Sequence, residues 1–274
     1  LACKIHNSRQ EGIKAFWFAT NVEMAYNEFD TLGRGIPALG EAIYIGSFNV
    51  NAPNDDTHDI DVHHNHFKSG VTADGIDVKS NCYIIHIWQN LFDEMVTPDT
   101  QGSAAIPLGA ITVGGQQVVV EYNRIVGMAH TGANADGDIN GITSWVPAII
   151  RYNLIVNTDR HGINLRASYV NNSGQQTSDF AGQNYDVDHN VCFNHGIGDE
   201  GGSGITVEGS LAPFALNCND NAATLSGIAQ GSNVTPSAAD FLGPLLGAAD
   251  AGDGVGSGFQ RSPGSSIPVG KGFY

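Results

Sequence analysis

A short phrase that recurs along the chain constrains the fold more than any other feature of the sequence. A Gly or Ala is followed by Ile, then usually by a polar residue and another apolar residue. The seven copies begin at Gly12, Ala42, Gly75, Ala110, Gly141, Gly162 and Gly204. Their average spacing is about 32 residues. Repeats of this length, built from short strands with variable loops between them, are typical of a solenoid.

An Asn-containing strand end precedes most copies of the phrase. These ends contain Asn7, Asn27, Asn65, Asn90, Asn123, Asn153 and Asn190. Each coil of a solenoid presents the same polar groups at its corners, and buried polar groups are costly unless they are hydrogen-bonded. Stacked side-chain amides that bond to one another or to the turn backbone would satisfy these groups. We therefore expect a ladder of Asn residues at one corner.

The composition is typical of an all-β chain with many turns, since 35 of its 274 residues are Gly and only 15% are charged. The net charge of −16 argues against a basic groove for nucleic acid. An acidic polysaccharide would also be repelled, unless cations bridge it to the protein or a local basic patch receives it. No stretch approaches the roughly 20 apolar residues of a membrane span. The scarcity of Lys and Arg in a solenoid favours a secreted or extracellular protein.

Aligning the copies of the phrase on one sheet places equivalent residues of neighbouring coils about 4.8 Å apart. One column contains Lys14, Tyr44, Asp77, Thr112, Thr143, Asn164 and Thr206, a second contains Phe16, Gly46, Lys79, Gly114, Trp145, Arg166 and Glu208, and a third contains Glu11, Glu41, Asp74, Gly109, Asn140, His161 and Ser203. Side chains alternate between the two faces of a strand, so Asp77 and Lys79 point outward together if their apolar neighbours point inward.

Three carboxylates are expected to meet a lysine where two of these coils adjoin. Glu41, Asp74 and Asp77 converge there, together with Tyr44 and Lys79. Hard cations such as calcium take several oxygen ligands, so this patch is a candidate calcium site. The pKa of the lysine depends on that cation, because bound calcium would lower it, whereas Asp74 and Asp77 without a metal would raise it.

The segment Asp74-Gly75-Ile76-Asp77-Val78-Lys79-Ser80 is similar to the Glu-Ser-Glu-Ile-Ile-Ser-Val-Lys-Ser segment of the alginate lyase and chondroitinase B family. In repeat style, nearly the whole chain resembles the right-handed parallel β-helix proteins of the pectate-lyase superfamily. The predicted fold is therefore an all-β right-handed parallel β-helix of about seven to eight coils over residues 1–210, with an incomplete N-terminus. Residues 211–274 are predicted to form an irregular C-terminal tail that closes the last coil.

The resemblance implies calcium-assisted β-elimination on a uronate-containing acidic polysaccharide, with Lys79 as the base and Asp74 as the second calcium ligand. The family's first ligand falls on Thr72. Its catalytic arginine falls within residues 110–115, which contain none, and Arg166 stands in the right column three coils along. The predicted site has Lys79, Tyr44 and Arg166 as catalytic residues, Trp145, His161 and Lys14 as substrate-binding residues, and Glu41, Asp74 and Asp77 as metal ligands.

Three other interpretations stay open. Asp77 and Lys79 as an exposed ion pair would be a common and energetically minor feature of a solenoid face. Residues 72–77 also resemble the Asn-Thr-Asp-Gly segment of polygalacturonases, and Asp93-Glu94 follows nearly one coil later, which suggests an inverting glycoside hydrolase with paired carboxylates. The third interpretation is a non-catalytic structural or adhesive β-helix within a larger extracellular protein or fibre, which could associate end to end by strand addition.

Overall fold

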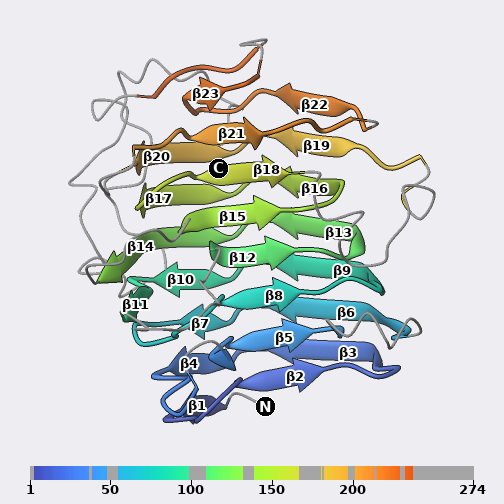
Figure 1. The fold of residues 1–274 in the computed structure, drawn as a ribbon, viewed down its shortest axis with the longest axis vertical. Coiled ribbons are helices and arrows are strands. Elements are labelled where there is room, and N and C mark those ends of the chain that lie inside the picture. Colours follow the sequence, from blue (N-terminus) through green and yellow to red (C-terminus); the bar gives the residue numbers. More distant parts are fainter. Residues whose placement is uncertain are drawn as a thin grey trace.

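The described part of the chain consists of β-strands stacked along one axis. The computed structural model describes residues 3–36, 39–47, 55–98, 109–131, 139–166, 180, 182–196, 201–212, 214–228 and 232–236. These residues form 23 strands and no α-helix. The strands follow one another along the axis in the order of the sequence, from β1 at one end to β22 and β23 at the other (Figure 1).

The strands form three parallel sheets, which we call sheets A, B and C. Sheet A contains β1 (Lys4–His6), β4 (Glu28–Asp30), β7 (His66–Phe67), β10 (Leu91–Asp93), β14 (Arg124–Thr131), β17 (Leu154–Thr158) and β20 (Val191–His195), with β11 (Val96–Pro98) paired to β14. Sheet B contains β2 (Ile13–Ala15), β5 (Ile43–Ile45), β8 (Ile76–Val78), β12 (Gly109–Val113), β15 (Asn140–Ser144), β18 (Ile163–Arg166), β21 (Ile205–Glu208) and β23 (Leu225–Ser226). Sheet C contains β3 (Thr20–Ala25), β6 (Thr57–His63), β9 (Cys82–Trp88), β13 (Gln116–Glu121), β16 (Ala148–Arg151), β19 (Tyr185–Asp188) and β22 (Leu216–Asn219).

The order of strands within each sheet is the order of the chain. Each coil passes through sheets C, A and B in turn, and the coils pair with one another in parallel register. This is the right-handed parallel β-helix that the repeats and the resemblance predict, and sheet B has eight strands in the described residues. The predicted columns are also confirmed, because Tyr44 is the Cα partner of Asp77, and Asp77 is the partner of Thr112.

The packing of the interior explains the repeated phrase. Ile76 is fully buried and is paired with equivalent Ile residues in the coils on either side. A Cβ atom added to Gly75 would lie 2.6 Å from the ring of Phe92 and 2.7 Å from the carbonyl oxygen of Ala110. Phe92 is itself fixed by stacking on Phe67, with 4.4 Å between the ring centres. A Gly or another small residue must therefore precede the Ile wherever the next coil approaches this closely.

The predicted Asn ladder lies at the corner between sheets C and A. Its members are Asn27, Asn65, Asn90, Asn123, Asn153, Asn190, Asn221 and Asn233. The peptide and amide nitrogens of Asn123 both donate to Oδ1 of Asn153, at 3.0 and 3.1 Å, and its amide also donates to the carbonyl of Ile87. Tyr122, just before it, has a φ of 56°, which turns the chain into the next sheet. Asn7 lies outside the ladder and is exposed.

Two strands lie within the predicted C-terminal tail. β22 extends sheet C by pairing with β19, and β23 extends sheet B by pairing with β21. The tail beyond residue 236 lies outside the described residues. Within the part of the chain that the structure describes, no helix is long and apolar enough to cross a membrane.

Candidate functional site

The predicted carboxylates and lysine lie together on the outward side of β5 and β8. Tyr44 and Asp77 are Cα partners on these two adjacent strands. Glu41 and Asp74 precede the same two strands, and the backbone of the following residue, Ala42, donates to the carbonyl of Asp74. The parallel register thus brings equivalent positions of the two coils next to each other. We call Glu41, Tyr44, Asp74, Asp77 and Lys79 the carboxylate–lysine cluster.

This cluster is buried, although its residues belong to the outward face of the sheet. The exposed fraction is 2% for Asp77, and the side chain of Lys79 keeps 19%. Glu41, Tyr44 and Asp74 are buried as well. The interpretation of Asp77 and Lys79 as an exposed surface ion pair is therefore wrong, because Asp77 is almost fully removed from water and Lys79 reaches water only in part. Charges that lose contact with water interact more strongly and cost more when they lose their partner.

Lys79 is held by a carboxylate and by an aromatic ring. Its ammonium group forms an ion pair with Asp77 and lies 5.0 Å from the centre of the Tyr44 ring. The ammonium group of Lys14 on β2 lies 4.2 Å from the same ring and pairs with Glu11 at 2.9 Å. The Tyr44 ring therefore contacts two ammonium groups, which is a favourable cation–π arrangement.

Asp74 and Glu41 are carboxyl groups with raised pKa values. Oδ1 of Asp74 accepts hydrogen bonds from the peptide nitrogen of Gly109 at 2.9 Å and from the hydroxyl of Thr112 at 3.1 Å. Burial and the neighbouring charge of Asp77 nevertheless raise the pKa of Asp74 to about 8 and that of Glu41 to about 7. Both carboxyl groups therefore exchange protons near neutral pH.

Lys79 is an ammonium ion in this arrangement. Burial lowers its pKa, but the charge of Asp77 and the hydrogen bond to it outweigh burial and hold the pKa of Lys79 above its usual value. Oε2 of Glu41 and Oδ1 of Asp77 are buried without a hydrogen-bond partner, and such oxygen donors fit a calcium ion. Within the described ranges, no three His, Cys, Asp or Glu side chains are arranged as a ready-made metal site, so calcium binding would require these carboxylates to turn toward one another.

The predicted residues Arg166, His161 and Trp145 form a second group. Arg166 is on β18, His161 is in the loop before it, and Trp145 directly follows β15. The guanidinium group of Arg166 pairs with Glu208 on β21 and lies 4.8 Å from the centre of a Trp145 ring. Glu208 also pairs with Arg160 at 3.2 Å and lies 3.5 Å from Nε2 of His161. Two arginines and a histidine thus converge on the carboxylate of Glu208. We call these five residues the arginine cluster.

His161 is a neutral hydrogen-bonding group in this cluster. Its Nδ1 accepts from the peptide nitrogen of Ser203 at 3.0 Å, so Nε2 carries the proton and faces Glu208. Burial and the charge of Arg160 lower the pKa of His161. His161 can therefore donate one hydrogen bond to an anion without carrying a charge itself.

The two clusters lie on one face of sheet B but do not touch. β12 and β15 separate β8 from β18, so Arg166 lies three strand steps, or about 14 Å, from Lys79. On β18, next to the arginine cluster, Asn164 is fully buried, and both polar atoms of its amide lack a hydrogen-bond partner. Asp93, the proposed partner of Asp77 in the hydrolase interpretation, lies on β10 in sheet A. The structure therefore does not place Asp93 beside Asp77 on sheet B.

Sequence reasoning missed a depression on the outer face of sheet C, which we call the sheet C groove. It crosses β3, β6, β9 and β13 and has a volume of about 730 Å³. Its lining includes Glu23, Asp61, Ile84, His86, Glu121 and Arg151. The signal available in the sequence was the pair of acidic residues at alternate positions of β6, Asp59 and Asp61, which both point outward and are exposed.

Comparisons with known proteins add little to what the strand pairing shows. No family model matches the chain, and no curated protein matches it. The crystal structure of an alginate lyase from Paenibacillus sp. str. FPU-7 is similar, with 15% sequence identity and a TM-score of 0.49. The match covers 85% of this chain and 64% of the alginate lyase, so the chain spans less than two thirds of that protein. A likeness at this level supports no statement about activity, and the fold rests on the strand pairing described above.

Proposed function

We propose that the chain is a polysaccharide lyase-like protein that cleaves a uronate-containing acidic polysaccharide by β-elimination, in a secreted or extracellular setting. The observation that carries this proposal is the buried ion pair of Lys79 and Asp77 against Tyr44, with two further carboxyl groups beside it. Burying this many ionisable groups on two adjacent coils is costly. Clusters with strongly perturbed pKa values are typical of functional sites.

In this proposal Lys79, once neutral, removes the proton from the carbon next to the sugar carboxylate. The electron pair left on that carbon forms a double bond while the bond to the glycosidic oxygen breaks, and the hydroxyl of Tyr44 donates a proton to that oxygen. Lys79 loses its own proton only when the charge of Asp77 is offset. Calcium held by Glu41, Asp74 and Asp77 would supply that offset and neutralise the sugar carboxylate.

The arginine cluster supports an acidic substrate. The protein has a net charge of −16, yet Arg160 and Arg166 converge with His161 on one carboxylate of the same sheet. A sugar carboxylate could replace Glu208 there, and the ring of Trp145 offers a surface for a sugar ring. A polysaccharide lying along sheet B would then contact both clusters. In this proposal Arg166 binds a sugar unit beyond the one that reacts.

The test is absorbance of the unsaturated product during incubation with alginate, polygalacturonate or chondroitin sulfate, with calcium or with a chelator. We expect one substrate to react in the presence of calcium, and Lys79→Ala to lower kcat at least about 100-fold. Lys68→Ala is the matched control, because Lys68 directly follows β7 of sheet A, is partly exposed and pairs with Glu28. Full activity in Lys79→Ala would refute the assignment of the base.

If none of these polysaccharides reacts, the scaffold interpretation takes the place of the lyase. Light scattering of the same preparation would then show particles that grow with protein concentration.

A further inference from the structure

The sheet C groove owes its shape to a shared backbone feature. Asn21, Asp59, Ile84 and Gln117 occupy equivalent positions on β3, β6, β9 and β13, and their φ angles are 55°, 54°, 56° and 52°. A left-handed residue inside a strand bends it, as in a β-bulge. Four neighbouring strands that bend at the same level make the outer face of the sheet concave. Positive φ is rare for a β-branched residue, so Ile84 is a strained, exposed apolar residue within the groove.

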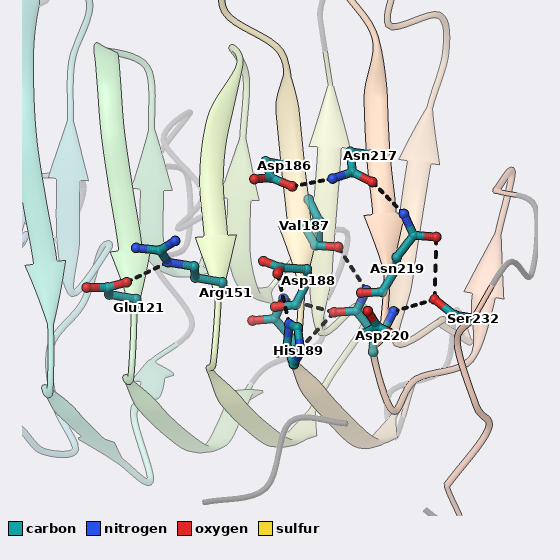
Figure 2. Close-up of polar contacts among 12 residues, drawn as sticks. Glu121, Arg151, Asp186, Val187, Asp188, His189, Asn217, Asn219, Asp220 and Ser232 are labelled. Carbon is teal, nitrogen blue, oxygen red and sulfur yellow. Dashed lines mark hydrogen bonds and ion pairs between the residues drawn. The ribbon is translucent and has the colours of Figure 1, made fainter. Parts of the chain in front are cut away.

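One wall of the groove is a chain of paired polar side chains. Nε of Arg151 donates to Glu121 at 2.7 Å, as Figure 2 shows, and Glu121 contacts Nε2 of His86 at 2.9 Å. At the end of this chain, Nδ1 of His86 lies 3.7 Å from a carboxylate oxygen of Asp61, which belongs to the opposite wall. Glu121 is largely buried and its charge is balanced by Arg151. This wall is therefore fixed and close to neutral.

The opposite wall carries a negative charge. Glu23, Asp59 and Asp61 are exposed on β3 and β6, and Glu23 and Asp61 are Cα partners. Their ion-pair contacts are to histidines, which carry charge only when protonated. In the described part of the chain, no Lys or Arg pairs with these three carboxylates. At neutral pH the groove therefore attracts cations and repels polyanions.

We propose that the sheet C groove is a second binding site for a glycan that carries amino groups, such as a chain of glucosamine units. Charge complementarity selects ammonium groups and excludes a uronate chain. The backbone groups of β6 and β9 are engaged by pairing on both sides, so an extended peptide cannot add there as a strand. The amide of Gln117 and the carboxylates suit sugar hydroxyls, and exposed Ile84 suits the C–H face of a sugar ring.

The test is titration calorimetry of the full chain with a glucosamine hexamer at neutral pH and low ionic strength. We expect the double variant Glu23→Gln with Asp61→Asn to weaken binding at least tenfold, and added salt to weaken binding to the unchanged chain. Both side chains are exposed, so the variant is expected to fold normally. Asp186→Asn is the matched control, because Asp186 lies outside the groove in the same outward column and bonds to Asn217 (Figure 2).

The choice of ligand is tested by three further probes. An uncharged β-linked glucose hexamer, spermidine and a lysine hexapeptide are each expected to bind at least tenfold more weakly than the glucosamine hexamer. Equal binding of the glucose hexamer would overturn the role of charge, and equal binding of spermidine or the peptide would overturn the choice of a glycan. Failure of the glucosamine hexamer to bind would overturn the site. None of these outcomes depends on lyase activity, because the cluster around Lys79 lies on sheet B.

Discussion

Charged residues in this protein differ mainly in how far they are removed from water. Lys4 and Lys79 both pair with carboxylates, but the side chain of Lys4 is 56% exposed, whereas that of Lys79 is almost covered. Exposed ion pairs contribute little to stability, because water screens them and both side chains lose freedom. A buried pair is different, since removal of one partner leaves the other charged and without solvent.

The first residue-scale prediction concerns this buried pair. Asp77→Asn keeps the shape of the side chain but leaves the ammonium group of Lys79 without its carboxylate. We expect the free energy of unfolding in urea to fall by about 3 kcal/mol. Asp30→Asn, which removes one of the carboxylates that pair with exposed Lys4, is expected to lower it by less than about 1 kcal/mol. Equal losses in the two variants would contradict the role of burial.

The second residue-scale prediction is a dependence of stability on pH. Glu41 and Asp74 have pKa values of about 7 and about 8 in the folded chain, so they hold protons that the unfolded chain releases near pH 4. Their contribution to stability is complete below about pH 4 and is lost as the pH rises to about 8. We expect the free energy of unfolding to fall between pH 5 and pH 8. Glu41→Gln should reduce that fall by on the order of 2 kcal/mol.

The control for the pH prediction is Glu28, a carboxyl group whose pKa is lowered, not raised, in the folded chain. Hydrogen bonds from Lys4 and Lys68 lower the pKa of Glu28 to about 2, so Glu28 is ionised throughout pH 5 to 8 in both states. Glu28→Gln should leave the slope over that range unchanged. Urea unfolding at several pH values measures both variants. A slope in Glu41→Gln as steep as in the unaltered chain would show that Glu41 is not protonated near neutrality.

At the scale of elements, the corner between sheets C and A joins successive coils through side chains. Each Asn between the two ends of the ladder, Asn27 and Asn233, both donates to one neighbour and accepts from the other, so a single substitution breaks bonds on both sides. Asn123 accepts from the peptide and amide nitrogens of Asn90 and donates to Asn153. The ladder also continues to Asn233, beyond the last copy of the sequence phrase. The corner is therefore a regular element in its own right, comparable to the strands it connects.

The element-scale prediction is the substitution Asn123→Ala. It removes the acceptor of Asn90 and the donor to Asn153 inside the fold, and buried polar groups without partners are costly. We expect the free energy of unfolding to fall by about 3 kcal/mol. Asn217→Ala is the control, because Asn217 is exposed on β22 and outside the ladder, and its loss should be below about 0.5 kcal/mol. A small effect at Asn123 would mean that water replaces the ladder bonds.

At the scale of the whole molecule, features that repeat from coil to coil could be predicted from the sequence, whereas features of a single coil or residue could not. The column of Tyr44 and Asp77 was predictable because parallel register carries the same position from coil to coil. The burial of the pair formed by Asp77 and Lys79 could not be predicted. The alternation of side chains along a strand shows which residues face outward, but not how far neighbouring groups shield them from water. The pairing of Arg166 with Glu208 was implicit in their shared column. Ile84 carries no sequence signal of a left-handed backbone, so the sheet C groove stayed hidden.

Because the coils stack regularly, the distance between two sites on one sheet is a whole number of strand spacings. Each complete coil adds one strand to every sheet, so the gap between Lys79 and Arg166 consists of whole strand steps (Figure 1). That gap can change only in increments of about 4.8 Å, by gain or loss of an entire coil. Loops between strands can lengthen without shifting either end. The solenoid therefore fixes the spacing between the groups that contact any polymer lying along sheet B, in units of one coil.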